Sequence, residues 1–320
     1  MNRSSRPSEI SQEVIDTLQN TAPSISKNED EFLRLLEQNA VSGGPPKDGI
    51  PAIEKPEYVT ASDADEWLLP NDIVFGVDYS GFVAAYPQRI LVWHEIANET
   101  INREKVSITY CPLTGTAIGF KGTIGEDVSS TFGVSGKLVN SNLIMYDRSS
   151  DSYWPQVLGR AINGAAYGRE LEEFPIVWTT WERWKKKYPN TKVLSRETGF
   201  VRNYSENGDP YGSYTKDEKG YYASDSIIFR PINEDKRLPA KTVVVGIRDK
   251  EGNAVAILKN SLRKQKTIET KLGEKTIVVT YDPDLDFHQA IIKDVRERIN
   301  SFDAMWFAWI AFYPDTRLIQ

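Results

Sequence analysis

An internal repeat is the feature that most constrains the fold of this 320-residue chain. The segments Ile73–Tyr86 and Val243–Ile257 follow the same plan. Each has an apolar strand with a glycine, a polar turn with a second glycine, and an alanine-rich returning strand. A second echo lies downstream of each, where Ile108-Thr-Tyr-Cys-Pro resembles Val279-Thr-Tyr-Asp-Pro. Recurrence of one supersecondary unit predicts two related β-rich parts that pack together.

The spacing within the two copies supports this prediction. Gly76 and Tyr110 are 34 residues apart, and Gly246 and Tyr281 are 35 residues apart. We therefore expect an α+β, β-rich fold made of two related halves, with helices at the periphery. The expected division is a helical arm and linker over 1–47, a first half over 48–200 and a second half over 201–320.

The first 40 residues read as helical. Ile10, Val14 and Leu18 fall on one face, and Asn28 with Glu31 resembles a capping box at the start of a second helix. The run Ser-Gly-Gly-Pro-Pro over 42–46 predicts a linker after this arm.

Two further helices are predicted. Residues 179–188 read as a helix stopped by Pro189, with Trp178, Trp181 and Trp184 at a spacing of three that favours core packing. Residues 287–299 read as an amphipathic helix with apolar residues on one side.

Composition bounds the function classes. Hydrophobic residues make up 40% of the chain, charged residues 26%, and the net charge is −6, so nucleic acid is not an expected partner. No apolar run approaches the roughly 18 residues of a membrane span, and no signal-peptide pattern is present. The expected location is cytoplasmic, or the cell envelope if a leader has been removed. The partner expected is an unknown small molecule or protein.

His94 and Cys111 are the principal candidate site residues. Imidazole can act as a base or a metal ligand near neutral pH, and a thiol at a strand end can act as a nucleophile or a soft-metal ligand. By the repeat, Cys111 corresponds to Asp282 and His94 roughly to Gln265, so only the first half carries this pair. A buried, structural histidine and a buried, inert cysteine are the alternatives.

Met145 could complete a soft ligand set with His94 and Cys111, which would favour copper or another transition metal. A standard copper electron-transfer site would need a second histidine. The only other one, His288, is expected to be structural.

Further polar and aromatic residues could contact a ligand. The glycine-flanked Ser135 suggests a loop with exposed amides, with a β-hairpin turn as the alternative. Asp147 could orient the histidine. The predicted substrate-binding residues are Ser135, Asn140, Tyr146, Asp147 and Trp154.

The chain resembles a family known as domain of unknown function 3179 over about residues 48–316. The resemblance implies a His-Glu pair at His94 and Glu95 and a motif cysteine at Cys111. Many relatives carry a second cysteine at the position of Thr114, and its absence argues against an obligatory C-x-x-C redox or zinc pair. Relatives often carry secretion signals, but the family has no settled activity. The resemblance is carried by Asp48-Gly-Ile-Pro51, Trp93-His-Glu-Ile96, Thr109-Tyr-Cys-Pro-Leu-Thr-Gly-Thr-Ala117, Phe132-Gly-Val-Ser-Gly136, Met145-Tyr-Asp-Arg148 and Val193-Leu-Ser-Arg-Glu-Thr-Gly199.

Three hypotheses follow. The first is a metal or redox site of His94 and Cys111, with Met145 as a further ligand. The second is a metal-free thiol enzyme in which Cys111 is the nucleophile, His94 its base, and Glu95 or Asp147 an orienting residue. The third is a ligand-binding or structural module in which Cys111 is buried and inert.

Overall fold

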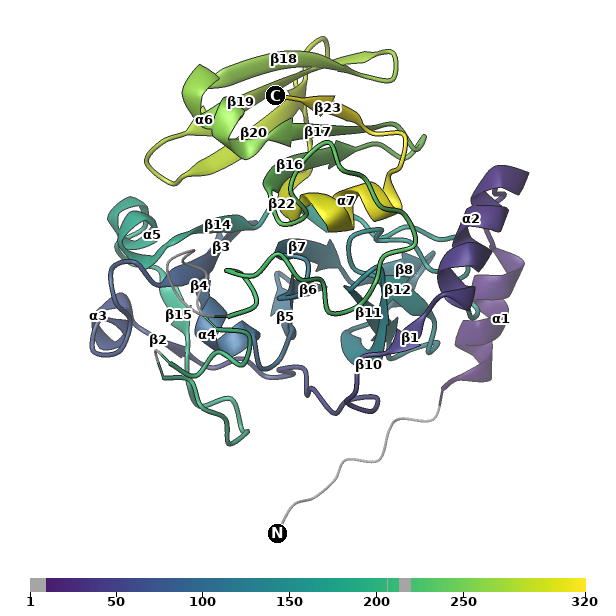
Figure 1. The fold of residues 1–320 in the computed structure, drawn as a ribbon. Helices are drawn as coiled ribbons and strands as arrows, with labels where there is room; N and C mark the ends of the chain where they lie inside the picture. The colour runs from purple at the N-terminus through teal and green to yellow at the C-terminus, as the bar shows by residue number, and fades with distance from the viewer. Residues whose placement is uncertain (1–9, 206, 213–219) are drawn as a thin grey trace.

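The fold was analysed in a computed structural model that describes residues 10–205, 207–212 and 220–320. Strands account for 38% of the chain and helices for 17%, which confirms a β-rich protein with helices. Figure 1 shows small sheets packed against one another, with helices at their margins.

The first repeated segment and the strands associated with it, from β2 to β7 and from β13 to β15, form two adjacent sheets. Their strand orders are β14-β3-β4-β15-β2 and β13-β7-β6-β5. The first sheet contains β14 (Val177–Thr180), β3 (Ile73–Tyr79), β4 (Phe82–Pro87), β15 (Lys192–Leu194) and β2 (Tyr58–Val59). The second contains β13 (Glu173–Phe174), β7 (Thr116–Lys121), β6 (Glu104–Cys111) and β5 (Ile96–Ile101).

The second repeated segment also forms two sheets, which lie at the top of Figure 1. Their strand orders are β22-β16-β17-β23 and β18-β19-β20-β21. The first contains β22 (Ser301–Met305), β16 (Val243–Arg248), β17 (Ala254–Leu258) and β23 (Arg317–Ile319). The second contains β18 (Thr267–Leu272), β19 (Lys275–Asp282), β20 (Phe287–Ile292) and β21 (Glu297–Ile299).

The two segments share a pairing pattern. In the first, β14 is antiparallel to β3 and β15 is parallel to β4. In the second, β22 is antiparallel to β16 and β23 is parallel to β17. A short helix links the outer strands in each case, α5 (Trp181–Lys187) in the first and α7 (Trp306–Phe312) in the second.

A further sheet, the inserted sheet, is formed by strands that lie between β7 and β13 in the chain, with β1 from the end of the N-terminal arm added at its edge. Its strand order is β1-β10-β11-β12, and a two-stranded ribbon of β8 and β9 precedes it in the sequence. The strands are β1 (Val41–Ser42), β10 (Phe132–Val139), β11 (Asn142–Asp147), β12 (Tyr153–Pro155), β8 (Thr123–Gly125) and β9 (Val128–Ser129).

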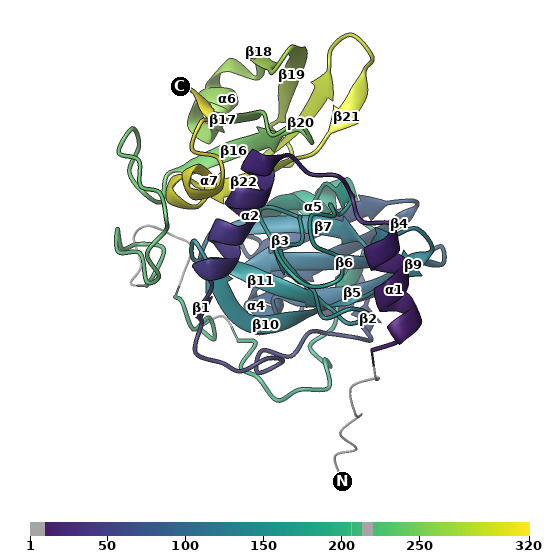
Figure 2. The same ribbon diagram turned by 90° about the vertical axis from the view of Figure 1, so that its right-hand side faces the viewer.

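The N-terminal arm is helical where it is described, as predicted. It consists of α1 (Gln12–Asn20) and α2 (Lys27–Gln38), which lie along one side of the molecule (Figures 1 and 2). The capping box of α2 is formed by Ser26 and Glu29 rather than by Asn28 and Glu31, because the helix begins two residues earlier than predicted. The remaining helices are α3 (Ala61–Ala64), α4 (Gln88–Leu91) and α6 (Lys259–Gln265).

The helix predicted over 287–299 is wrong. These residues form strands β20 and β21, and β20 pairs along its length with β19. The spacing of the apolar residues in this stretch is compatible with the period of a helix and with that of a strand, so pairing with the neighbouring strand decides the structure. The helix predicted over 179–188 is confirmed as α5, and Trp181 and Trp184 are buried as expected.

One core joins the parts of the chain. All seven residues of α7 are buried, and six of them pack in one cluster with Cys111, Met145 and Trp154. The loop that carries the cysteine is therefore held between the inserted sheet and the second repeated segment. Within the described ranges, no helix is long and apolar enough to cross a membrane.

Candidate functional site

Cys111 ends strand β6 at the start of a tight turn. Gly115 closes this turn with φ +61°, and its N–H donates to the carbonyl of Cys111 at 3.0 Å. The sulfur is buried, accepts from the N–H of Leu143 at 3.4 Å and lies 3.7 Å from the carbonyl oxygen of Ser141. Burial, together with the nearby charge of Glu95, raises the pKa of the Cys111 thiol to about 11.

Glu95 has an unusual backbone conformation close to this strand end. It follows the short helix α4 and has φ +60°, a left-handed conformation that is uncommon outside glycine. Its carbonyl accepts from the N–H of Tyr110 at 2.7 Å, which fixes it beside the last residues of β6.

The carboxyl of Glu95 is buried without a hydrogen-bond partner among the described residues. Only 5% of the residue surface is exposed, and burial alone raises its pKa to about 8. Its charge raises the pKa of Cys111 and of Tyr211. The thiol and the tyrosine hydroxyl are therefore both coupled electrostatically to this carboxyl.

His94 takes part in a different set of contacts. Its Nδ1 lies 2.7 Å from the carbonyl oxygen of Pro51 and its Nε2 lies 2.5 Å from the hydroxyl of Tyr204. The ring also packs against Phe200. Burial lowers the pKa of His94 to about 4, so the ring is neutral at physiological pH. The charge that acts on the thiol is thus that of Glu95, whereas His94 is bonded to other groups.

A buried polar network supports the cysteine turn. Thr114 Oγ1 lies 2.8 Å from Thr116 Oγ1, and Thr116 donates to Gln156 Oε1 at 2.6 Å. Asn142 donates to both Thr114 and Gln156 at 3.1 Å. All four residues are fully buried, and their mutual bonds fix the turn from one side.

Tyr221 and Met305 hold the turn from the opposite side. The hydroxyl of Tyr221 donates to the carbonyl of Leu113 at 2.9 Å, and the N–H of Met305 donates to the carbonyl of Thr114 at 2.9 Å. Burial raises the pKa of Tyr221, and the charge of Cys111 adds to this effect.

Met145 is buried in the same apolar cluster as Cys111. Over the described residues, no group of three or more His, Cys, Asp and Glu side chains is arranged to hold a metal ion. Both nitrogens of His94 already have partners, so the copper set of His94, Cys111 and Met145 gains no support from the geometry and stays a prediction.

Ser135 and Asn140 bond within the protein. Ser135 lies in a bulge of β10 and donates to the carbonyl of Ile144 at 2.5 Å. Asn140 lies in a turn with φ +54°, donates to the carbonyl of Ala311 at 3.3 Å and accepts from the N–H of Ile232 at 2.8 Å. These contacts tie the β10–β11 turn to α7.

The other three predicted substrate-binding residues also have internal partners. Asp147 is buried and accepts from the indole of Trp154 at 3.0 Å and from the hydroxyl of Ser150 at 2.8 Å. Tyr146 donates to Asp48 at 2.6 Å and accepts from Arg148 at 2.6 Å. Their polar groups are used to order the inserted sheet, and ligand binding by these residues stays a prediction.

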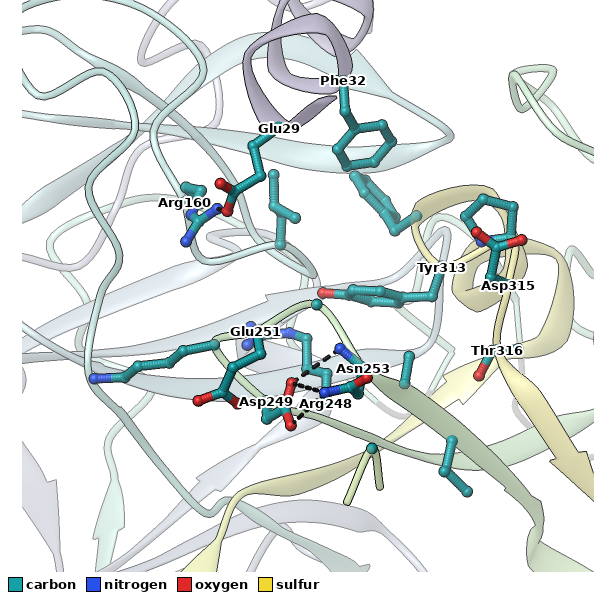
Figure 3. Close-up of a pocket in the computed structure, with 18 of the residues that line it drawn as sticks. Glu29, Phe32, Arg160, Arg248, Asp249, Glu251, Asn253, Tyr313, Asp315 and Thr316 are labelled. Carbon is teal, nitrogen blue, oxygen red and sulfur yellow. Dashed lines mark hydrogen bonds and ion pairs between the residues drawn. The ribbon is translucent and has the colours of Figure 1, made fainter. Parts of the chain in front are cut away.

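Two hollows lie near these elements. One, of about 520 Å³, is lined by Trp93, Arg202 and Tyr211. Tyr211 is the tyrosine whose pKa is raised by the charge of Glu95. The other, of about 600 Å³, lies between α2 and the second repeated segment (Figure 3).

The hollow in Figure 3 is bordered by charges that already have partners. Phe32 enters it from α2 toward Tyr313, while Arg160 pairs with Glu29 at 2.6 Å. Asp249 accepts from the side chain of Asn253 at 2.9 Å. This hollow is therefore a space between the N-terminal arm and the β core, and it is not a candidate catalytic site.

Sequence reasoning missed Tyr211, Tyr221 and the network around Thr114. Tyr211 and Tyr221 come from a segment without periodicity, and only the fold brings them to the cysteine. Gln156 and Asn142 could have been found from the sequence. An amide side chain inside or beside an apolar strand lowers the stability of the fold unless it is hydrogen-bonded, so such a residue predicts a buried polar network.

Comparison with known proteins agrees with the resemblance noted from the motifs. Neither the curated proteins nor the solved structures contain a significant match to this chain. The sequence profile of the family described as "Protein of unknown function (DUF3179)" matches residues 47–297. The chain, matched over most of its length, belongs to the DUF3179 family.

Proposed function

We propose that the protein acts through a metal-free pair of Cys111 as nucleophile and Glu95 as its proton acceptor. The observation that carries the proposal is the carboxyl of the largely buried Glu95, whose charge acts on the thiol and which has no hydrogen-bond partner among the described residues. His94, the base expected from the sequence, would instead position the adjoining loop through Pro51 and Tyr204.

A buried carboxyl without a partner is costly to the fold. Its desolvation is not repaid by hydrogen bonds, and such groups concentrate at functional sites. Glu99 provides the contrast within the same strand region. Burial also raises the pKa of Glu99 to about 8, but its carboxyl accepts from the hydroxyl of Tyr86 at 2.8 Å and from Tyr58.

The pKa order defines the chemistry of the pair. The proton rests on sulfur, because the pKa of Cys111, about 11, lies above that of Glu95, about 8. As the sulfur attacks a substrate carbonyl carbon, its proton moves to the ionised Glu95, the S–C bond forms and the carbonyl π electrons move to oxygen. When the adduct collapses, Glu95 returns the proton to the leaving group.

The hollow lined by Trp93 and Tyr211 offers a route to the pair. Its volume of about 520 Å³ lies within the usual range for small-molecule sites of about 300–1,000 Å³. Tyr211 lines this hollow and its pKa is raised by the charge of Glu95, so we expect a substrate to approach the pair from the side of Tyr211.

The test is the pH dependence of alkylation of Cys111, the only cysteine in the chain, by iodoacetamide. We expect the rate for the folded wild-type chain to rise through about pH 8, where Glu95 ionises, and Glu95→Gln to lose this rise. Glu99→Gln is the matched control and should keep it, because Glu99 is bonded to tyrosines away from the sulfur.

The same experiment separates the alternatives. If Glu95 acted only through its charge, Glu95→Gln would lower the pKa of Cys111 and alkylation would be faster, not slower. No labelling of the folded chain at any pH would favour the inert cysteine of a binding or structural module. Metal that copurifies with the wild type and is lost in both Cys111→Ala and His94→Ala would favour copper or another transition metal instead.

We also infer that the two repeated segments derive from one duplicated unit. Three observations support this. The strand pairing is the same in both. Glu95 and Lys266, at matching positions, have φ +60° and +65°. The carbonyl of each accepts from the tyrosine of the matching strand, at 2.7 and 2.8 Å. Because the second copy has Lys266 and Asp282 in place of Glu95 and Cys111, the proposed chemistry belongs to the first copy alone.

A further inference from the structure

A third cavity, distinct from the two hollows described above, lies between the two repeated segments. Its volume is about 370 Å³, and β14, β16, α6 and β22 contribute to its wall. Gly115 of the cysteine turn also lines it, so this cavity adjoins the back of the proposed thiol site. Its apolar wall contains Trp178, Leu258 and Met305.

Two of the cations in the cavity wall are neutralised by carboxylates that also line it. Lys259 pairs with Asp303, which also lies 3.1 Å from Nε2 of His288. Arg263 pairs with Asp286 through two hydrogen bonds, at 2.8 and 2.5 Å. These pairs form a fixed polar wall whose charges cancel.

Lys241 is the third cation in the wall, and no carboxylate of the described residues forms an ion pair with it. Its ammonium donates to the main-chain carbonyls of Tyr221 and, at 2.6 Å, of Ser224, and it lies 3.4 Å from the centre of the Tyr221 ring. Asp225 acts on it only as a more distant charge, and burial lowers the pKa of Lys241 to about 8. The cavity thus carries one cation in excess, held in place by fixed carbonyls.

We propose that this cavity binds a small organic anion, with its carboxylate at Lys241 and an apolar or aromatic group against Trp178 and Met305. A partly desolvated ammonium binds an anion more strongly than an exposed one, because the surrounding dielectric is lower. The volume, at the small end of ligand sites, suits a single ring with one charged group. The proposal is independent of the thiol chemistry.

The test uses benzoate as the probe and benzyl alcohol as its uncharged counterpart, with binding followed by calorimetry. Wild type should bind benzoate more tightly than benzyl alcohol, and Lys241→Met should weaken benzoate binding by about tenfold or more, as expected for a charged hydrogen bond. Lys293→Met is the matched control and should leave binding unchanged, because Lys293 is half-exposed and paired with Glu269. Cys111→Ser should also bind benzoate normally, which separates this proposal from the proposed function.

A measurement on the wild-type chain guards against a misfolded variant. Benzoate should shift the indole N–H resonance of Trp178, assigned with Trp178→Phe, more than those of the buried Trp154 and Trp184. Equal binding of benzoate and benzyl alcohol, unchanged affinity in Lys241→Met, or an unshifted Trp178 would each overturn the proposal.

Discussion

At the scale of single residues, the positive φ of Glu95 decides the site. His94 and Glu95 are neighbours in the sequence, yet the left-handed turn at Glu95 sends their side chains into different environments. The imidazole bonds to Pro51 and Tyr204, whereas the charge of the carboxyl acts on Cys111. Two residues that the sequence suggests as partners are thereby given separate roles.

The buried His94 should make the protein less stable in acid. Its pKa is about 4 in the folded chain against an ordinary value of 6.5, so the unfolded chain binds the proton first. Its contribution to stability is therefore complete above about pH 6.5 and falls as the pH drops toward 4. Between pH 7 and pH 5 this group should cost roughly 2 kcal/mol of unfolding free energy.

The measurement is urea unfolding of the wild type and His94→Gln at both pH values. The variant should lose roughly 2 kcal/mol less than the wild type between pH 7 and pH 5, because glutamine does not titrate. Equal losses in the two proteins would contradict a neutral, buried imidazole.

At the scale of elements, each helix that follows an outer strand packs a tryptophan onto a glycine of the central strand. Trp184 of α5 covers Gly76 of β3, and Trp309 of α7 covers Gly246 of β16. Each indole N–H donates to a threonine seven residues later, at 2.9 and 3.0 Å. The glycine is required for contact distance rather than for its φ, since an added Cβ would lie 2.2 or 2.1 Å from the ring.

Adding a methyl group at either of these glycines should destabilise the sheet. We expect Gly76→Ala to lower the free energy of unfolding by about 1–3 kcal/mol, because the new methyl group overlaps Trp184. Denaturant unfolding measures the change, and Gly246→Ala should behave alike against Trp309.

A double-mutant cycle provides the control. In the background of Trp184→Phe, whose ring is smaller, Gly76→Ala should cost less than it does alone. Strictly additive effects would show that the glycine is needed for some reason other than room for the indole.

At the scale of the whole molecule, the N-terminal arm is a tethered addition to the β core. Leu33 and Leu36 of α2 are buried in the core cluster that also contains Cys111. Arg160 and Tyr167 of the inserted region bond to Glu29 and Asp30 at 2.6 and 2.8 Å. The arm thereby forms one wall of the hollow in Figure 3.

Loss of the buried leucine should loosen the arm before the core. We expect Leu36→Ala to cost about 2–3 kcal/mol, seen as faster hydrogen exchange of the α2 amides with little change in β3 and β6. Leu35→Ala is the matched control, because Leu35 is 41% exposed, and it should change exchange by no more than about 0.5 kcal/mol. Equal effects of the two substitutions would mean that α2 is not seated through Leu36.

The sequence by itself determined the β-rich class, the helical arm and the helix at 179–188, because each follows from local periodicity and from residues that stop or cap an element. It also singled out Cys111 and Glu95 as candidates. It failed at 287–299, where the apolar spacing suits both helix and strand and only pairing with β19 decides.

Only the tertiary structure decided which polar groups meet. Tyr211 and Tyr221 lie about a hundred residues from Cys111 in the chain, and Lys241 faces Asp303 and Asp286 across a seam that no local pattern marks. Periodicity reports which face of an element is buried, but not which element covers it. The environment that sets the pKa of Glu95 therefore exists only once the chain has folded.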